Sequence, residues 1–273
     1  MNIIVGALSG YHWDMVETWW RSIKLTVNNS EVHCLLYKDK GAEKELKRRG
    51  VVVHKCQLTH PQVVVSRFLD LAKLCRVIKG NPFIIFTDMS DLIFQRDPNR
   101  FLETVNQSIV VASEGVSFAG NKWANKNLST SFPEHYKLLK GKDIYNAGSI
   151  AVKAKTMAIL AEEVYTMCMN RPKAENHDQA ALNYLIQTKY KEDTLFTDVN
   201  GPWCFNAASS LTASNGLDRR NYSGKPVHIK SGKLYNDDGT MPCMFHHWNR
   251  RRELNREVKH FIYKEFKRRF PNE

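Results

Sequence analysis

Paired cysteines at metal-ligand or redox spacing are missing from this sequence of 273 residues, whose six cysteines are scattered with no Cys-x-x-Cys pair. The pattern excludes a dense disulfide framework and favours reduced, mostly buried thiols. No apolar run approaches the ~20 residues of a membrane-spanning helix, and the first ten residues, MNIIVGALSG, lack the basic start of a secretory signal. We therefore expect a cytoplasmic protein that is soluble or bound peripherally to a membrane.

Internal repeats, low-complexity tracts and linker-like segments are also missing. The length is ample for one hydrophobic core, so we expect a single domain spanning residues 1–273. Gly6 and Gly10 do not form the Gly-x-Gly-x-x-Gly pattern, which argues against a dinucleotide-binding dehydrogenase.

Acidic residues are too few to balance the basic ones: 40 Lys and Arg against 28 Asp and Glu give a net charge of +12. Such a balance attracts nucleic acid, anionic membrane surfaces or phosphorylated small molecules. The basic residues are dispersed except near the C-terminus, and no recognised reader motif for nucleic acid is present, so we expect no nucleic-acid partner. A non-catalytic protein that binds polyanions through its basic surface stays open as an alternative.

Apolar runs alternate with helical periods through the first third of the chain. The segment 66–78 places apolar residues at i, i+3, i+4, i+7 and i+10, which is the stripe of a helix packed on one side. The alternation predicts an α/β domain whose central sheet is mainly parallel and flanked by helices. The expected strands are 2–8, 31–37, 51–56 and 82–86, and the expected helices are 11–24, 41–50 and 66–78.

The rest of the chain is less regular. Asp97-Pro98 predicts a helix start, because Asp is a good N-cap and Pro fits the first helical position. The polar segment 120–136 predicts irregular structure, and the turn residues 236–240 predict a hairpin within a small antiparallel C-terminal part. Further strands are expected at 108–113, 145–152 and 193–199, with helices around 157–168 and 176–187 and a basic helix at the C-terminus.

Two carboxylates, Asp88 and Asp91, follow directly on the buried strand 82–86. Ligands of open parallel sheets bind outside the carboxyl ends of the strands. Carboxylates at such a place suit Mg²⁺ or Mn²⁺, which bind through one or two acids together with substrate phosphates. The alternative is that TDMSD is a simple turn, since Asp and Ser favour turn positions.

An apolar strand, an aspartate cluster, a short apolar run and Asp-Pro together resemble the metal-binding segment of GT-A nucleotide-sugar glycosyltransferases. The family motif is Asp-x-Asp, and the spacing here, DMSD, is one residue longer. Counted back from Asp97-Pro98, Asp91 takes the place of the metal-binding aspartate. Asp88 then lies one residue out of register, facing the ribose or the metal.

The resemblance is strongest to retaining family-8-like enzymes and covers most of the chain. GALSGYH resembles their first strand and nucleoside-binding turn, SRFLDLAKL the helix that sends an arginine to the donor, and YNAGSIAVKAKTM their Asn-x-Gly strand. It divides the chain into a nucleotide-binding half (1–115), a half for acceptor and donor sugar (116–250) and a basic C-terminal helix (251–273). The donor-binding residues that it implies are Ala7, Ser9, Tyr11, Arg67, Asp88 and Asn146.

Two further segments complete the implied site. NHDQAALNYLI resembles the Asp-Gln helix of the family, so that Asp178 would bind sugar hydroxyls and Gln179 would lie near the reacting carbon. FHHWNRRREL stands where the family has a histidine that completes the metal shell. The implied metal ligands are therefore Asp88, Asp91 and His246, with His247 as the reserve, for Mn²⁺ or Mg²⁺.

Each of these residues also has an ordinary structural explanation. Asp178 could be an acid in the first turn of a helix capped by Asn176 with Gln179, where it favours the helix dipole. On that helix, however, it shares the face of Leu182 and Leu185, and an inward carboxylate needs a partner. An inward His246 is commonly a satisfied core residue.

Other candidate residues have stronger structural explanations. Glu114 is a spare acid that we expect to be exposed in a loop, and Trp123 and Trp248 are expected to pack rather than to stack on sugars. The C-terminal helix is amphipathic and could lie on an anionic membrane, but we favour a helix packed on the domain with a solvated basic face. Lys153 and Lys230 are both candidates for contacts with phosphate.

The resemblance implies a metal-dependent hexosyl- or pentosyltransferase that moves a sugar from a nucleotide-diphosphate donor, expected to be a UDP-sugar, to a hydroxyl of a glycan, glycoprotein or glycolipid. Retention is expected, because the departing phosphate oxygen can deprotonate the acceptor on the same face. An inverting enzyme would need a carboxylate base, Asp178 or Glu114. A sugar-1-phosphate nucleotidyltransferase is the rival enzyme, although the turn after the first strand has no basic residue, and a degenerate sugar-binding domain without metal is a further alternative.

Overall fold

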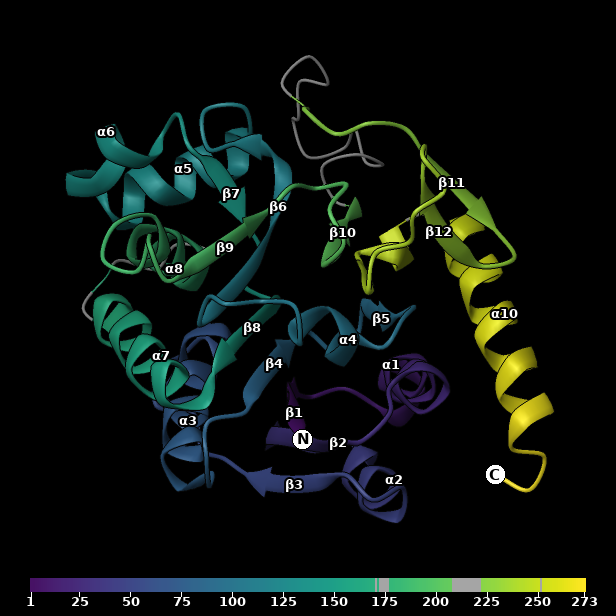
Figure 1. Cartoon of the computed structure of the whole chain (residues 1–273). Coiled ribbons are helices and arrows are strands. Elements are labelled where there is room, and N and C mark those ends of the chain that lie inside the picture. The colour runs from purple at the N-terminus through teal and green to yellow at the C-terminus, as the bar shows by residue number, and fades with distance from the viewer. Residues whose placement is uncertain (170, 172–176, 208–221, 251) are drawn as a thin grey trace.

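The computed structural model describes residues 1–169, 171, 177–207, 222–250 and 252–273. Its centre is an eight-stranded sheet in the order β3-β2-β1-β4-β8-β6-β7, with β9 paired to β6 (Figure 1). The strands at the β3 edge are parallel and alternate with helices, as the sequence predicted. This part contains β1 (Asn2–Ser9), α1 (Trp13–Thr26), β2 (Ser30–Lys38), α2 (Ala42–Arg48), β3 (Val52–Lys55), α3 (Val63–Val77) and β4 (Phe83–Thr87).

The other half of the sheet contains the antiparallel pairings. The strand β8 runs antiparallel to both β4 and β6, whereas β9 runs parallel to β6. The sheet is therefore mostly but not wholly parallel. This half contains β6 (Ile109–Ser117), α5 (Lys122–Ser131), α6 (Tyr136–Leu139), β7 (Asp143–Tyr145), β8 (Ser149–Lys153), α7 (Ala154–Met169), α8 (His177–Gln187) and β9 (Thr194–Thr197), together with a 3-10 turn at Pro133–His135.

Two layers of helices cover the sheet (Figure 1). Alternate side chains of each strand point to opposite faces. Ile84 and Phe86 of β4 therefore join the core beneath α3, α7 and α8, whereas Phe83 and Ile85 join the core beneath α1. Both faces are buried, which explains the nearly continuous apolar sequence of β4.

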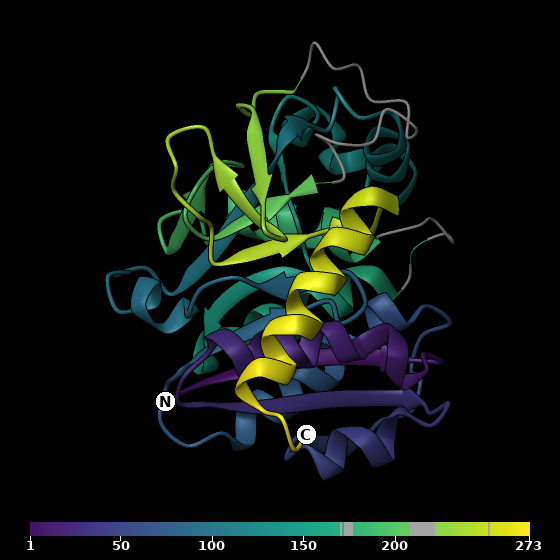
Figure 2. The same ribbon diagram turned by 90° about the vertical axis from the view of Figure 1, so that its right-hand side faces the viewer.

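A third, smaller core lies beside α1. The strands β10 (Cys204–Asn206), β13 (Met244–His246) and β5 (Leu92–Phe94) form a three-stranded sheet, and β11 (Val227–Lys230) pairs with β12 (Lys233–Asn236) in a hairpin. The last helix, α10 (Arg252–Arg269), crosses in front of α1 (Figure 2). It buries Leu254, Val258, Ile262 and Phe266, so the packed arrangement predicted for this helix is observed.

Two predictions about local structure are wrong, and two short strands were missed. The segment 120–136 is not irregular, because Asn121 caps α5 by accepting hydrogen bonds from Trp123 N and Ala124 N. The hairpin turns at Ser231 and Gly232, and residues 236–240 instead form the turn that follows β12. The three-residue strands β5 and β10 were not predicted at all.

Smaller features agree with prediction or fall outside the described residues. Asp97 caps the short helix α4 (Pro98–Leu102) and accepts a hydrogen bond from Asn99 N. A 3-10 turn at Trp248–Arg250 precedes α10, and Trp248 is buried as expected. The predicted cap Asn176 lies outside the described residues. Among the helices that are described, none is long and apolar enough to cross a membrane.

Candidate active site

The two aspartates lie where the sequence predicted, at the carboxyl end of β4. Thr87 at the end of β4 pairs with Ser149 at the start of β8, so the chain before β8 runs beside Asp88. The amide of Asp88 donates to Gly148 O over 2.9 Å. A Cβ on Gly148 would lie 2.2 Å from Asp88 Oδ2, which explains why glycine stands there.

The extra residue of the DMSD segment is accommodated because a side chain of this segment packs into the hydrophobic core. Met89 is buried, and its sulfur lies 3.8 Å from Cys34 Sγ. A Cβ on Gly6 would lie 2.4 Å from Met89 Cγ, so the glycine of β1 makes room for the methionine. With Met89 turned inward, Asp88 and Asp91 both face the same pocket.

The histidine predicted to join the aspartates does reach them. His246 at the end of β13 is 1% exposed, and its Nε2 lies 3.4 Å from Asp88 Oδ2 and 3.3 Å from Asp91 Oδ1. Its ring stacks on that of His247, with centroids 3.7 Å apart. Burial opposes protonation, but the carboxylates of Asp91 and Asp88 outweigh it and raise the pKa of His246 to about 9. Burial and the neighbouring His246 lower the pKa of His247 to about 3.

Arg67 of α3 joins two carboxylates from distant parts of the chain. Its guanidinium lies 2.5 Å from Asp88 Oδ1 and 2.9 Å from Asp178 Oδ2. Burial alone would raise the pKa of Asp88, but the charge of Arg67 and the contact with His246 hold it far below the ordinary value. Arg67 was predicted to contact the donor directly; what the structure shows is that it supports two other predicted residues, Asp88 and Asp178.

Asp178 at the start of α8 is 2% exposed and points into the pocket, as its place on the apolar face predicted. Burial raises its pKa in spite of Arg67. Its Oδ2 is bonded to Arg67, whereas its Oδ1 has no hydrogen-bond partner within the described part of the chain. A buried carboxylate oxygen without a donor is costly, and a hydroxyl entering the pocket would supply one.

A buried carboxylate also orients two amides of the pocket. Glu114 was expected to be an exposed loop acid, and this is wrong: it lies on β6 and is 6% exposed. The strand continues through an irregularity at Gly115, whose φ is 72°. Asn146 Nδ2 and Gln179 Nε2 donate to Glu114 Oε1 over 2.9 and 3.2 Å. The side-chain oxygen of Asn146 accepts from Gly148 N over 2.7 Å.

These side chains surround one pocket of about 370 Å³. The structure brings together every residue predicted for the donor and for catalysis, and the buried His246 contacts Asp88 and Asp91 without itself lining the pocket. Contributors that the sequence did not single out include Val63 and Val64 of α3 and Arg250, whose guanidinium lies 3.7 Å from Asp91 Oδ2. The predicted residues that line the pocket are Ala7, Ser9, Tyr11, Arg67, Asp88, Asp91, Asn146, Asp178, Gln179 and His247.

The two lysines suggested for phosphate lie elsewhere. Lys153 is paired with Phe83 at the opposite end of β4 and sits over its ring. Lys230 belongs to the β11–β12 hairpin and does not line the pocket. Arg250 lines the pocket and is the better candidate for a contact with phosphate. The sequence did not indicate it, because nothing distinguishes Arg250 from the other arginines of the same run.

No family model matches the chain, and no curated protein matches its sequence. Among solved structures it is similar to the glycosyltransferase GlyE of Streptococcus pneumoniae TIGR4, with a TM-score of 0.61 and 13% identity over 98% of this chain and 62% of that one. The apo form of GlyE gives a TM-score of 0.57 and 13% identity, over 98% and 63%. The chain thus spans less than two thirds of GlyE.

A third similar structure is that of the galactosyltransferase LgtC in complex with donor and acceptor sugar analogs. It matches with a TM-score of 0.58 and 13% identity, over 96% of this chain and 95% of LgtC. At such low identity the likeness concerns the fold. The chain therefore has the mixed α/β GT-A fold of these glycosyltransferases, with a mostly parallel central sheet flanked by helices.

Proposed function

We propose that this protein is a metal-dependent glycosyltransferase that transfers a sugar from a nucleotide-diphosphate donor, a UDP-sugar, to a hydroxyl of a glycan, glycoprotein or glycolipid. The observation that carries the proposal is the convergence of Asp88, Asp91 and Asp178 on one pocket at the carboxyl ends of the strands, with His246 in contact with the first two. The fold that it shares with glycosyltransferases, one of them crystallised with donor and acceptor analogs, supports the same conclusion.

The residues present fit a divalent cation. His246 Nδ1 lies 3.1 Å from Asn206 Oδ1 and can donate to it, so a cation that displaces the proton of Nε2 would find this nitrogen facing the carboxylates. Asp91 and His246 would hold the ion, Mn²⁺ or Mg²⁺, with Asp88 beside them. When bound, the ion would stabilise the negative charge that develops on the departing diphosphate.

The remaining side chains would bind and orient the donor. Ala7, Ser9 and Tyr11, together with Val63 and Val64, form the wall that would receive the nucleoside. Arg250 would add a charge-assisted hydrogen bond to phosphate. Asp178 would accept a sugar hydroxyl at its unbonded Oδ1, while Arg67 keeps the carboxylate in place.

The arrangement favours retention of configuration. Asp178 is bonded to Arg67, and Glu114 lies behind the amides that it orients. Glu114 is therefore not free to serve as the base that an inverting enzyme requires, and Asp178 would use its unbonded Oδ1 on a sugar hydroxyl of the donor. Gln179 lines the pocket beside Asn146 and would orient the sugar, while the departing phosphate oxygen takes the proton of the acceptor hydroxyl.

Calorimetric titration tests the proposal directly. UDP and GDP would be titrated with and without Mn²⁺ into the wild type and into Asp91→Asn, which preserves the shape of the side chain. We expect UDP binding that requires metal in the wild type and is lost in the variant. If neither nucleotide binds under any metal condition, the proposed function is wrong.

A further inference from the structure

The two neighbouring histidines face the same side of the chain, which a regular strand does not allow. Successive side chains of a strand point to opposite faces. His247 does not follow the alternation of a strand because its φ is 60°, a left-handed conformation that residues other than glycine seldom adopt. Its amide donates to Asp91 O over 2.7 Å and fixes the turn. Strained backbone of this kind is concentrated at functional sites.

As a result, both rings approach one carboxylate. His246 Nε2 lies 3.3 Å from Asp91 Oδ1, and His247 Nε2 lies 3.9 Å from Asp91 Oδ2. One potential ligand atom from each of these three residues lies within 4.8 Å of the other two. Ligands about 2.1 Å from a shared ion are roughly 3 to 4 Å apart, so the three side chains need only small adjustments to share one.

The buried ring nitrogen of His246 is placed as a metal ligand would be. His246 is almost wholly buried, and its Nε2 faces Asp91 Oδ1 and Asp88 Oδ2 at 3.3 and 3.4 Å, longer than a well-formed hydrogen bond. Asn206 Oδ1 faces the other nitrogen of His246, the kind of support that fixes the tautomer of a metal-binding imidazole. Buried polar atoms normally make well-formed hydrogen bonds, and a metal ion held between these atoms would account for their spacing.

Asp88, in contrast, is bonded to Arg67. Its Oδ1 lies 2.5 Å from the guanidinium, and its Oδ2 lies beside Gly148 and 3.4 Å from His246 Nε2. We infer that the metal set of this protein is Asp91, His246 and His247, and that Asp88 serves to hold Arg67 rather than the ion. The inference rests on the proposed function, because the ion is the one that would meet the diphosphate.

This set differs chemically from one made of two carboxylates and one imidazole. Imidazole nitrogens suit Zn²⁺ and other transition metals, whereas Mg²⁺ prefers oxygen ligands. The affinities should therefore follow the order Co²⁺ over Mn²⁺ over Mg²⁺, and Co²⁺ should bind without any nucleotide. Mg²⁺ binding should need the phosphate oxygens of a bound donor.

The test uses Co²⁺ on the full chain without nucleotide. Co²⁺ shifts the exchangeable ring N–H protons of each coordinated histidine far outside the normal proton NMR range, so the shifted signals count the imidazole ligands. Wild type and Asp88→Asn should each show two such signals, and His247→Gly, which tolerates the positive φ, should show one. Titration monitored by visible absorption should give an affinity at least tenfold weaker for His247→Gly.

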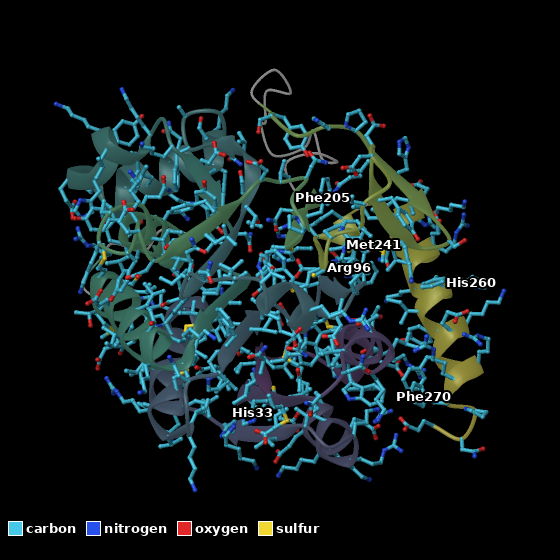
Figure 3. The ribbon with its side chains drawn as sticks, in the orientation of Figure 1. His33, Arg96, Phe205, Met241, His260 and Phe270 are labelled. Atoms are coloured by element: carbon cyan, nitrogen blue, oxygen red, sulfur yellow. The ribbon has the colours of Figure 1, made fainter. Side chains whose placement is uncertain are left out.

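His260→Ala is the matched control, since His260 is exposed on α10, near the edge of the molecule (Figure 3). It should leave both signals and the Co²⁺ affinity unchanged, and thermal unfolding would verify that His247→Gly is folded. One signal in the wild type that His247→Gly does not alter, together with loss of Co²⁺ in Asp88→Asn, would overturn the inferred set. UDP binding with Mn²⁺ would then still support the proposed function, whereas failure of both metal and nucleotide to bind would overturn both.

Discussion

Asn146 Nδ2 donates to Glu114 Oε1 over 2.9 Å, so a buried carboxylate determines which way a pocket amide faces. Gln179 is held by the same oxygen. Glu114→Leu should release both amides and reduce the catalytic efficiency of sugar transfer about ten- to a hundredfold, since hydrogen bonds to charged groups contribute about 1.5–3 kcal/mol.

Glu114→Gln is the conservative comparison, because it keeps an oxygen that can accept from both amides. It should recover most of the lost efficiency, and neither variant should alter UDP affinity more than about threefold, because Glu114 lies behind the sugar end of the pocket. Steady-state kinetics together with calorimetry separate the two effects. Equal losses of UDP binding and turnover would contradict an orienting role.

Asp178→Asn should separate sugar recognition from nucleotide binding. The substitution keeps the shape of the side chain but removes the charge that faces Arg67 and the acceptor oxygen available to a sugar hydroxyl. We expect transfer to fall more than about a hundredfold, with UDP affinity nearly unchanged. The loss of a buried ionic partner should also lower the free energy of unfolding by about 3–5 kcal/mol, which urea denaturation measures. Unchanged transfer would show that Asp178 is structural.

Gly148→Ala should disturb the site through a single added methyl group. The added Cβ would lie 2.2 Å from Asp88 Oδ2, so the Asp88 carboxylate must shift. We expect a loss of about 1–3 kcal/mol in the free energy of unfolding and weaker metal-dependent binding of UDP. Gly141→Ala is the matched control, because a Cβ there meets no atom within 4 Å. Equal stability of the two variants would count against the close approach.

Phe266→Ala tests whether α10 is an integral part of the domain. Phe266 is buried, and its ring centroid lies 5.3 Å from that of Trp20 on α1. Its removal should lower the free energy of unfolding by about 3–5 kcal/mol. The neighbouring exposed Lys267→Ala should change it by less than about 0.5 kcal/mol. A small effect of Phe266→Ala in urea denaturation would indicate a helix that detaches easily.

His54 should make the protein sensitive to mild acid. His33, near the β2–β3 edge of the sheet (Figure 3), places its Nδ1 3.0 Å from His54 Nε2. Burial, with His33 nearby, lowers the pKa of His54 below its ordinary value of 6.5. His54 therefore contributes stability that is present above pH 6.5 and is lost as the pH falls through the lower folded-state pKa. Urea denaturation between pH 5 and 7 should show a shallower loss for His54→Gln than for the wild type.

The alternating half of the fold could be predicted because its signals are local. Strand and helix periods in the first 90 residues each depend on neighbouring side chains, and the observed elements follow them closely. The strands β5 and β10 have only three residues and are defined by pairing with β13, far along the chain. The helix α5 is rich in Asn, Ser and Thr, and is stabilised by its cap and its packing rather than by intrinsic propensity.

The residues that form the site were easier to predict from the sequence than the hydrogen bonds among them. The resemblance identified residues that the structure places around one pocket, but their roles stay predictions. The bond between Arg67 and Asp178 joins residues 111 positions apart, and the acceptor role of Glu114 depends on an irregular strand. The left-handed turn at His247 also left no signal in the sequence, because histidine rarely adopts it.

The burial of Met89 under Gly6 couples two positions that are distant in the sequence. An extra residue between Asp88 and Asp91 is tolerated here because its side chain is apolar and a glycine on the next strand leaves space for it. Substitutions of Gly6 and Met89 should therefore be tolerated only in combination, with a larger residue in place of Gly6 and a smaller one in place of Met89. Substitution of either residue alone should displace the carboxylates of Asp88 and Asp91. The inner face of β1 therefore limits which substitutions this pocket can accept during evolution.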